Sequence, residues 1–166
     1  MTKVYLSTGS NLGDRQSKLQ VAINMLNDYA GISVLRVSPI YETKPWGYLN
    51  QPRFLNQVVE IETEIAPVEL VSVMKHLEKE MGRTPNFKNG PRVIDMDVVL
   101  YGSWIIEQEG ITIPHPFFPE RAFVLVPLAD LIPDFIHPVL GKTIQQLMTG
   151  IDCSGVTRYT EPGEKE

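Results

Sequence analysis

One stretch near the middle of the chain reads Gly90-Pro91-Arg92-Val93-Ile94-Asp95-Met96-Asp97-Val98-Val99-Leu100-Tyr101. It places two carboxylates inside a run that is otherwise typical of a buried strand. Side chains two positions apart on a strand share a face, so Asp95 and Asp97 are expected to point the same way, about 6.6 Å apart at their roots. Unpaired buried carboxylates are costly, so the pair must be solvated, matched by Arg or Lys, or bound to metal. Oxygen ligands on one rigid strand suit Mg²⁺, and we predict a magnesium site here.

An exposed edge strand with an acidic outer face is the alternative explanation of this pair. The strand carries Val, Ile, Leu and Met on both faces, which implies cover on one side and partial cover on the other. The pattern therefore favours a functional site.

Length and composition predict one compact domain over residues 1–166. The chain has 166 residues, 43% of them hydrophobic, which is enough for a self-sufficient core. Its polar end, from about residue 152 to 166, is expected to be frayed. The single cysteine, Cys153, excludes an intrachain disulfide framework and agrees with a reducing compartment. Without a signal peptide or a long apolar run, we expect a cytoplasmic protein that does not interact with membranes.

The net charge argues against broad nucleic-acid binding. At −5, the chain has no global positive field that would gather phosphates. Cations instead cluster around the acidic stretch, with Arg83, Lys88 and Arg92 near it and Arg121 after it. Ordinary surface charge is the simpler explanation for Lys88, whereas the mixture of both signs suits a site for a metal and a nucleotide.

The order of predicted elements is β-α-β-β-α-β. Strands are expected over 4–8, 32–37, 55–63 and the acidic stretch, with one helix capped by Asp14 and a second from Pro67 to Gly82. This succession predicts an α+β, ferredoxin-like antiparallel sheet with helices on one face and the other face free for a site. After Tyr101 we expect a short hairpin (104–106 with 112–113) and short C-terminal helices over 121–131 and 143–148.

Two connections are too long to be simple turns. Residues 41–53 carry Trp46 and Tyr48 in a loop that contains proline and glycine, and residues 82–92 are basic. Long loops without regular structure are often lids or binding loops, which we predict for both.

A set of motifs resembles the 6-hydroxymethyl-7,8-dihydropterin pyrophosphokinase family of folate biosynthesis, over nearly the whole chain from Val4 to about Met148. The motifs are Gly9-Ser10-Asn11, Tyr41-x-Thr43 followed by Gly47, Gln51-Pro52-x-Phe54-Leu55-Asn56, Gly82-Arg83, the stretch 90–101, Ile113-Pro114-His115-Pro116, and Arg121-x-Phe123-Val124-Leu125-x-Pro127-Leu128.

The resemblance implies transfer of the β,γ-pyrophosphoryl unit of ATP to the hydroxymethyl group of the reduced pterin, which yields AMP. It implies that Asp95 and Asp97 hold two Mg²⁺ ions and that the transfer is in line, with positioning and electrostatics dominating. Asp95 is also the nearest candidate to receive the hydroxyl proton. The expected partners are these two small molecules, and the expected oligomeric state is a monomer.

The same resemblance implies roles for further residues. Arg83 and Arg92 match catalytic positions beside the two aspartates. The residues matched to ATP contacts are Arg83, Arg92, Thr112, His115 and Arg121. The residues matched to pterin contacts are Thr43, Trp46, Phe54, Asn56, Asp95 and Phe123, with the two phenylalanines expected to sandwich the ring. Core packing is the alternative for Phe54 and Phe123, and a structural loop for His115.

The basic loop departs from the family pattern. The family usually has an Arg and a Trp where this chain has Pro85 and Asn89, and Gly110 replaces an Arg of some members. These differences predict weaker or slower closure over ATP. Two rival functions remain open, namely a binding module without turnover and an ordinary magnesium-dependent kinase that releases ADP.

Overall fold

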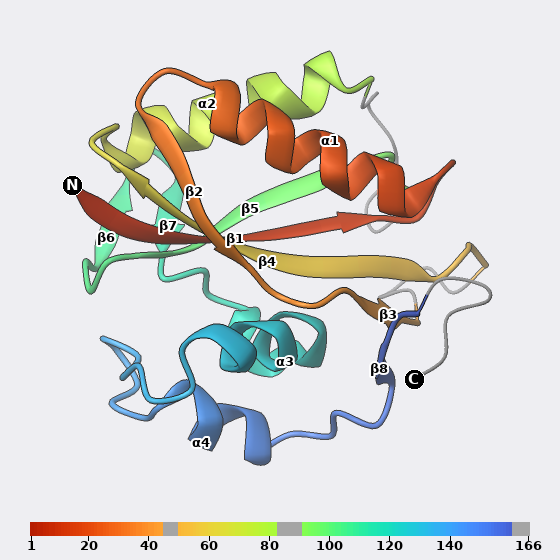
Figure 1. Ribbon diagram of the computed structural model, residues 1–166. Coiled ribbons are helices and arrows are strands. Elements are labelled where there is room, and N and C mark those ends of the chain that lie inside the picture. The colour runs from red at the N-terminus through yellow and green to blue at the C-terminus, as the bar shows by residue number, and fades with distance from the viewer. Residues whose placement is uncertain (45–49, 83–90, 161–166) are drawn as a thin grey trace.

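The centre of the protein is a six-stranded antiparallel sheet (Figure 1). The structure is a computed structural model that describes residues 1–44, 50–82 and 91–160. The strands run in the order β5-β1-β4-β3-β8, and β2 also pairs with β4. Their bounds are β1 Thr2–Ser10, β2 Ile32–Val37, β3 Tyr41–Thr43, β4 Phe54–Thr63, β5 Asp95–Tyr101 and β8 Val156–Arg158, and a separate hairpin joins β6 Ile106–Gln108 to β7 Ile111–Ile113.

Two helices, α1 (Arg15–Asp28) and α2 (Pro67–Glu80), cover one face of this sheet (Figure 1). Asp14 caps α1 by accepting the backbone N–H of Ser17 at 3.2 Å, and Pro67 opens α2, as predicted. The helices pack their buried side chains against alternate residues of the strands to form the main hydrophobic core. That core includes Leu19, Leu26, Leu70, Met74 and Leu77 from the helices and Val4, Leu6, Leu55, Val59 and Ile61 from the sheet.

The opposite face is also covered in part, by α3 (Ala122–Leu131) and α4 (Ile144–Thr149) (Figure 1). The mixed α/β architecture with an antiparallel sheet is confirmed, but the expectation of helices on one face only is wrong. Tyr5, Val58 and Leu100 make this face apolar at one end, and they form a second buried cluster with α3 and α4. The sequence predicts both helices but not which face of the sheet they cover, because α3 is apolar nearly all round and shows no single packing side.

One edge of the sheet is built from segments that were expected to lack regular structure. Tyr41–Thr43, which the sequence pattern predicts to lie in a loop, forms β3, and the tail that is expected to be frayed supplies β8, which pairs with β3. The backbone N–H of Tyr159 donates to the Ile40 carbonyl at 2.8 Å. The Cζ atom of Arg15 lies 5.7 Å from the centre of the Tyr159 ring. Strands of three residues are too short to show a period, which is why the sequence pattern does not reveal them.

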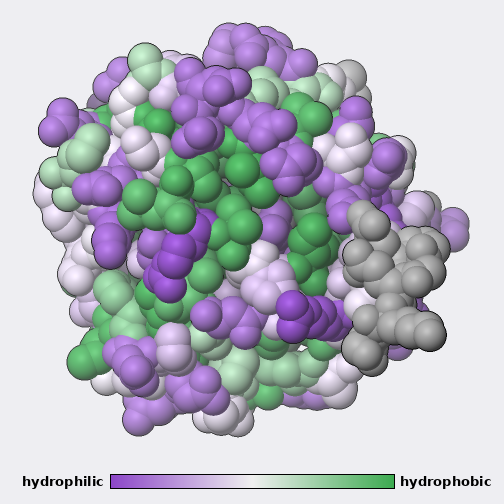
Figure 2. Space-filling model, in the orientation of Figure 1, coloured by the Kyte–Doolittle hydropathy of each residue, from purple (hydrophilic) through white to green (hydrophobic). Residues whose placement is uncertain are grey.

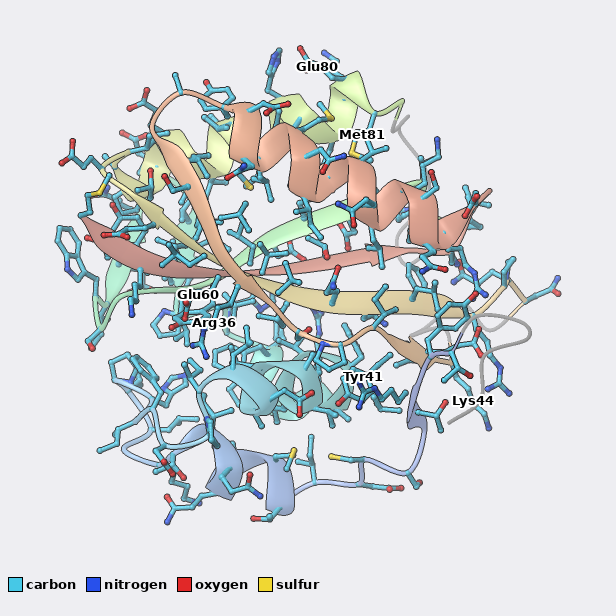
Figure 3. The ribbon with its side chains drawn as sticks, viewed as in Figure 1. Arg36, Tyr41, Lys44, Glu60, Glu80 and Met81 are labelled. Atoms are coloured by element: carbon cyan, nitrogen blue, oxygen red, sulfur yellow. The ribbon has the colours of Figure 1, made fainter. Side chains whose placement is uncertain are left out.

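A buried carboxylate lies within the second face. Glu60, which is 2% exposed, accepts the Tyr5 hydroxyl at 2.5 Å and two bonds from the Arg36 guanidinium at 3.0 and 2.7 Å (Figure 3). The Arg36 bonds come first among the causes that lower the pKa of Glu60, whereas burial beside this carboxylate raises the pKa of Tyr5. Glu60 is therefore a paired, structural charge.

The surface on the side of β2 mixes hydrophilic and hydrophobic side chains (Figure 2). Leu35 and Val37 of β2 are among the exposed hydrophobic residues. In the described parts of the chain, no helix combines the length and the apolarity needed to cross a membrane.

Candidate functional site

An open pocket of about 170 Å³ lies on the second face of the sheet, between the strands and the start of α3. Its lining comprises Ser7, Gly9, Thr43, Lys44, Phe54, Asn56, Arg92, Asp95, Asp97, Val99, His115, Phe118, Arg121, Phe123 and Val124. The structure therefore brings together most of the residues that the sequence singled out, from six separate parts of the chain.

The two aspartates sit side by side at this pocket. In the register of β5 and β1, Asp97 lies opposite Ser7 and Asp95 opposite Gly9. The residue between them, Met96, faces the main core instead, and its backbone N–H donates to the buried Glu78 carboxylate of α2 at 2.8 Å. Strand alternation and this bond fix which way both aspartates point.

The oxygens of Asp95 and Asp97 fit a magnesium ion. Nowhere in residues 1–44, 50–82 and 91–160 do three His, Cys, Asp or Glu side chains gather as a complete metal cage. Mg²⁺ does not need such a cage, since it commonly keeps several waters and is held by one or two carboxylates together with phosphate oxygens.

Gly9 of β1 leaves space for the side-chain amide of Asn56 on the neighbouring strand β4. It pairs with Asp95 on one side and with Asn56 on the other. A Cβ on Gly9 would approach Asn56 Oδ1 to 2.8 Å, a distance that real Cβ atoms essentially never show. The Asn56 amide donates to Thr43 Oγ1 at 2.8 Å, so it has one fixed orientation at the pocket.

Asn11 ties the segment of Arg92 to the start of β4. Its Oδ1 accepts the backbone N–H of Arg92 at 2.7 Å, and its own backbone N–H donates to the Arg92 carbonyl at 3.0 Å. Its amide nitrogen donates to Gln51 Oε1 at 2.8 Å and to the Pro52 carbonyl at 3.0 Å. The buried Asn11 thus positions two pocket walls that are far apart in sequence.

A bulge in β5 helps to hold His115 at the pocket. Val99 is an extra residue between the pairs Leu6–Val98 and Tyr5–Leu100, and its carbonyl accepts the His115 N–H at 3.0 Å. Burial, followed by the nearby Arg121 charge, lowers the pKa of His115 to about 4, although Asp95 opposes this. The Nδ1 atom accepts the Phe117 N–H at 3.2 Å, so the neutral ring carries its proton on Nε2.

Arg121 is the N-cap residue of α3. Its guanidinium group lies close to two aromatic rings, those of Phe117 and Phe123. Its Cζ atom is 5.6 Å from the centre of the Phe117 ring and 5.8 Å from that of Phe123. Both distances are within the range of cation–π attraction.

Among the predicted site residues that the structure describes, Thr112 is the one that does not line the pocket. It is exposed on β7. Trp46 and Arg83 lie outside the described residues, as do Pro85 and Asn89 of the atypical loop.

Several lining residues were missed by the sequence reasoning: Ser7, Lys44, Val99, Phe118 and Val124. The signal for Ser7 was present, because Tyr5 and Ser7 alternate with the apolar Val4 and Leu6 along β1. Nothing in the local sequence distinguishes Phe118 and Val124 from ordinary core residues.

The sequence is similar to those of known pyrophosphokinases. The family model described as 7,8-dihydro-6-hydroxymethylpterin-pyrophosphokinase (HPPK) matches residues 5–133. The chain is 41% identical to a 2-amino-4-hydroxy-6-hydroxymethyldihydropteridine pyrophosphokinase of Aquifex aeolicus, over 88% of this chain and 90% of that one. It is 44% identical to the folic acid synthesis protein fol1 of Schizosaccharomyces pombe over 98% of this chain, but spans only 22% of that longer protein.

Solved structures agree in fold. A crystal structure of Plasmodium falciparum HPPK-DHPS, wild type with pteroate, superposes with a TM-score of 0.72 at 17% identity, over 90% of this chain and 42% of that one. At that identity the likeness concerns the fold alone. Since the family model spans more than half of the sequence, the chain belongs to the 7,8-dihydro-6-hydroxymethylpterin-pyrophosphokinase family.

Proposed function

We propose that the protein transfers the pyrophosphoryl group of ATP to the hydroxymethyl group of 6-hydroxymethyl-7,8-dihydropterin, giving AMP and the pterin diphosphate. The observation that carries this is the pair Asp95 and Asp97 in a pocket that also presents arginines and aromatic rings. Family membership and the names of its bacterial relatives support the same reaction.

Asp95 and Asp97 would hold the magnesium, and we propose two ions. Bound there, the metal would neutralise phosphate charge and draw the nucleophile and phosphorus into line. The two carboxylates share one strand face, so their oxygens are held in a fixed relation without an ordering cost at each turnover. Asp95, the nearer to Asn56 in the register, is our candidate to receive the hydroxyl proton.

The cationic residues would bind the triphosphate. Arg92 and Arg121 offer planar guanidinium groups that suit phosphate oxygens, and neutral His115 offers its Nε2–H as a donor. Arg83 is proposed for the same role by its match to the family motif. Thr112 stays a proposed ATP contact, and it requires the nucleotide to extend beyond the pocket toward β7.

The pterin would bind where amide and aromatic groups meet. Phe54 and Phe123 both line the pocket, and stacking between rings suits a flat heterocycle. Asn56, oriented by Thr43, can read the polar edge of the ring. Trp46 is proposed as a further contact from the motif alone.

We also propose that the sheet is of the ferredoxin-like type. The order β5-β1-β4 with β2 on β4, and α1 and α2 together on one face, supports this. The monomeric state, the cytoplasmic location and the weakened closure of the loop around Pro85 and Asn89 stay predictions.

Product analysis tests the reaction. We expect incubation with ATP, Mg²⁺ and the hydroxymethyl-dihydropterin, followed by nucleotide chromatography, to yield AMP and pterin diphosphate in equal amounts. ADP as the nucleotide product would instead identify an ordinary kinase. Binding of both substrates without any turnover would identify a binding module.

A further inference from the structure

The guanidinium of Arg121 is flanked by two phenyl rings that differ in their exposure. Phe123 is half-buried and lines the pocket, whereas Phe117 is 55% exposed and is not part of the lining. The centres of the two rings lie at nearly equal distances from Arg121 Cζ, at 5.8 and 5.6 Å. Phe117 therefore does not line the pocket itself, but its ring contacts Arg121, which does.

Two hydrogen bonds fix the main chain of Phe117, and a ring contact orients its side chain. Its N–H donates to His115 Nδ1 at 3.2 Å, and its carbonyl accepts the N–H of Glu120 at 3.1 Å in the short helical turn Phe118–Glu120. Its ring meets the His115 imidazole edge to face, at 6.0 Å and 65°. An exposed ring that is fixed in this way can act as a rigid wall.

A flexible arginine loses conformational freedom when it binds a phosphate, and a preformed position reduces that cost. Arg121 has the cation–π attraction of two rings to restrict it, together with its backbone position as the cap of α3. Removing one ring would leave the charge in place but widen the range of positions that the guanidinium visits.

We propose that Phe117 is a positioning residue for ATP binding, which holds the Arg121 guanidinium between itself and Phe123. The proposal rests on the proposed function, because it assigns to Arg121 a contact with the phosphates of ATP. Phe117 itself touches neither substrate.

Steady-state kinetics test the proposal. Phe117→Leu keeps an apolar side chain but removes the ring, and we expect the KM for ATP to rise about two- to fivefold, which corresponds to about 0.5–1 kcal/mol for one exposed cation–π contact. We expect kcat and the KM for the pterin to change less than twofold. Phe117→Tyr keeps the ring and restores the parental KM for ATP.

A double-mutant cycle shows whether the effect passes through Arg121. In an Arg121→Ala background, Phe117→Leu should produce no further change in the KM for ATP. Trp104→Leu serves as the matched control, because Trp104 is an aromatic residue of similar exposure (56%) away from the pocket. An unchanged KM in Phe117→Leu, or an equal rise in the Arg121→Ala background, would overturn the proposal.

A spectroscopic measurement does not depend on turnover. In NMR spectra of the ¹⁵N-labelled protein, the side-chain N–H signals of Arg121 should show a ring-current shift that Phe117→Leu removes and Phe117→Tyr retains. Absence of any change in these signals would also overturn the proposal. If the parental protein makes no AMP but the signals shift as described, the proposed function fails while the contact between Phe117 and Arg121 stands.

Discussion

The two faces of the central sheet are made by the same strands but carry different kinds of residue. Below α1 and α2, alternate positions such as Val4, Leu6 and Val59 are buried and apolar, and the polar Thr8 and Gln57 that continue this face are buried as well. On the other face the pattern is divided, since Tyr5 and Val58 pack against α3 and α4, whereas Gly9 and its neighbours open into the pocket. The pocket thus occupies only half of one face, and the face below α1 and α2 is covered by packing.

The strongest test of this division is Asp97→Ala, which changes the pocket side of β5. We expect the rate of AMP formation to fall by at least about 10²–10³-fold, because a group that stabilises developing charge is lost. The free energy of unfolding should change by less than about 1 kcal/mol, since no apolar core is disturbed. Activity assays and urea unfolding measure the two effects.

The isosteric variant Asp97→Asn is the control for shape. It should lose activity to a similar degree, because its amide keeps the size but not the charge. Retention of most activity in either variant would contradict the role of Asp97 in holding the metal.

The converse change is Leu6→Ala on the opposite face of β1. Leu6 is fully buried under the helices, and its truncation should cost about 2–5 kcal/mol of unfolding free energy, from lost burial and the cavity left behind. Below the unfolding transition, kcat per folded molecule should stay within about twofold of the parent. A large fall in kcat with intact folding would show that the two faces are coupled.

Gly9→Ala tests the close packing inside the pocket. The added Cβ would approach Asn56 Oδ1 to 2.8 Å, so the amide must move, at about 1–3 kcal/mol. We expect the KM for the pterin to rise about 5- to 150-fold, which is the equivalent of that free-energy range, while the KM for ATP changes little. In the double variant Gly9→Ala with Asn56→Ser, stability should recover but pterin binding should not. Parental pterin affinity in Gly9→Ala would refute the role given to Asn56.

The buried Glu60 sharpens the comparison, because it is a charge on the second face that serves structure. Its pKa is lowered, first by the Arg36 hydrogen bonds, so its contribution to stability is complete above its unfolded pKa of about 4.3 and is lost as the pH falls through the folded value. Glu60→Gln should therefore cost about 1–3 kcal/mol at pH 7. The difference from the parent should shrink below about pH 4, in urea unfolding measured across pH. A difference that does not depend on pH would contradict this account.

The sequence predicts the helices and strands in which apolar residues recur at one regular spacing. The bounds of β2 were predicted without error, and Asp14 and Pro67 begin their helices as expected, because caps and apolar stripes are local signals. Asp95 and Asp97 stood out because carboxylates are costly in a buried strand. The motifs of the family then supplied most of the pocket.

Other features depend on contacts between distant segments, and no local pattern encodes them. The side on which α3 packs is decided by the apolar end of the second face, and β8 forms because β3 offers it a free edge. The aromatic contacts of Arg121 arise only once the turn at Phe117 has folded back. The exposure of Thr112 could likewise not be known from its match to an ATP contact of the family.

The bulge at Val99 makes the length of β5 more important than the identity of that residue. With strict alternation, Asp95, Asp97 and Tyr101 would share one side, but the extra residue sends Tyr101 to the main core. Deleting a single codon there would rotate one end of the strand by half a turn, so that either the acidic pair or the tyrosine would face the wrong environment. Substitutions at Val99 are milder, since the carbonyl that receives His115 belongs to the backbone. This strand should therefore tolerate amino-acid substitutions at Val99 far better than insertions or deletions.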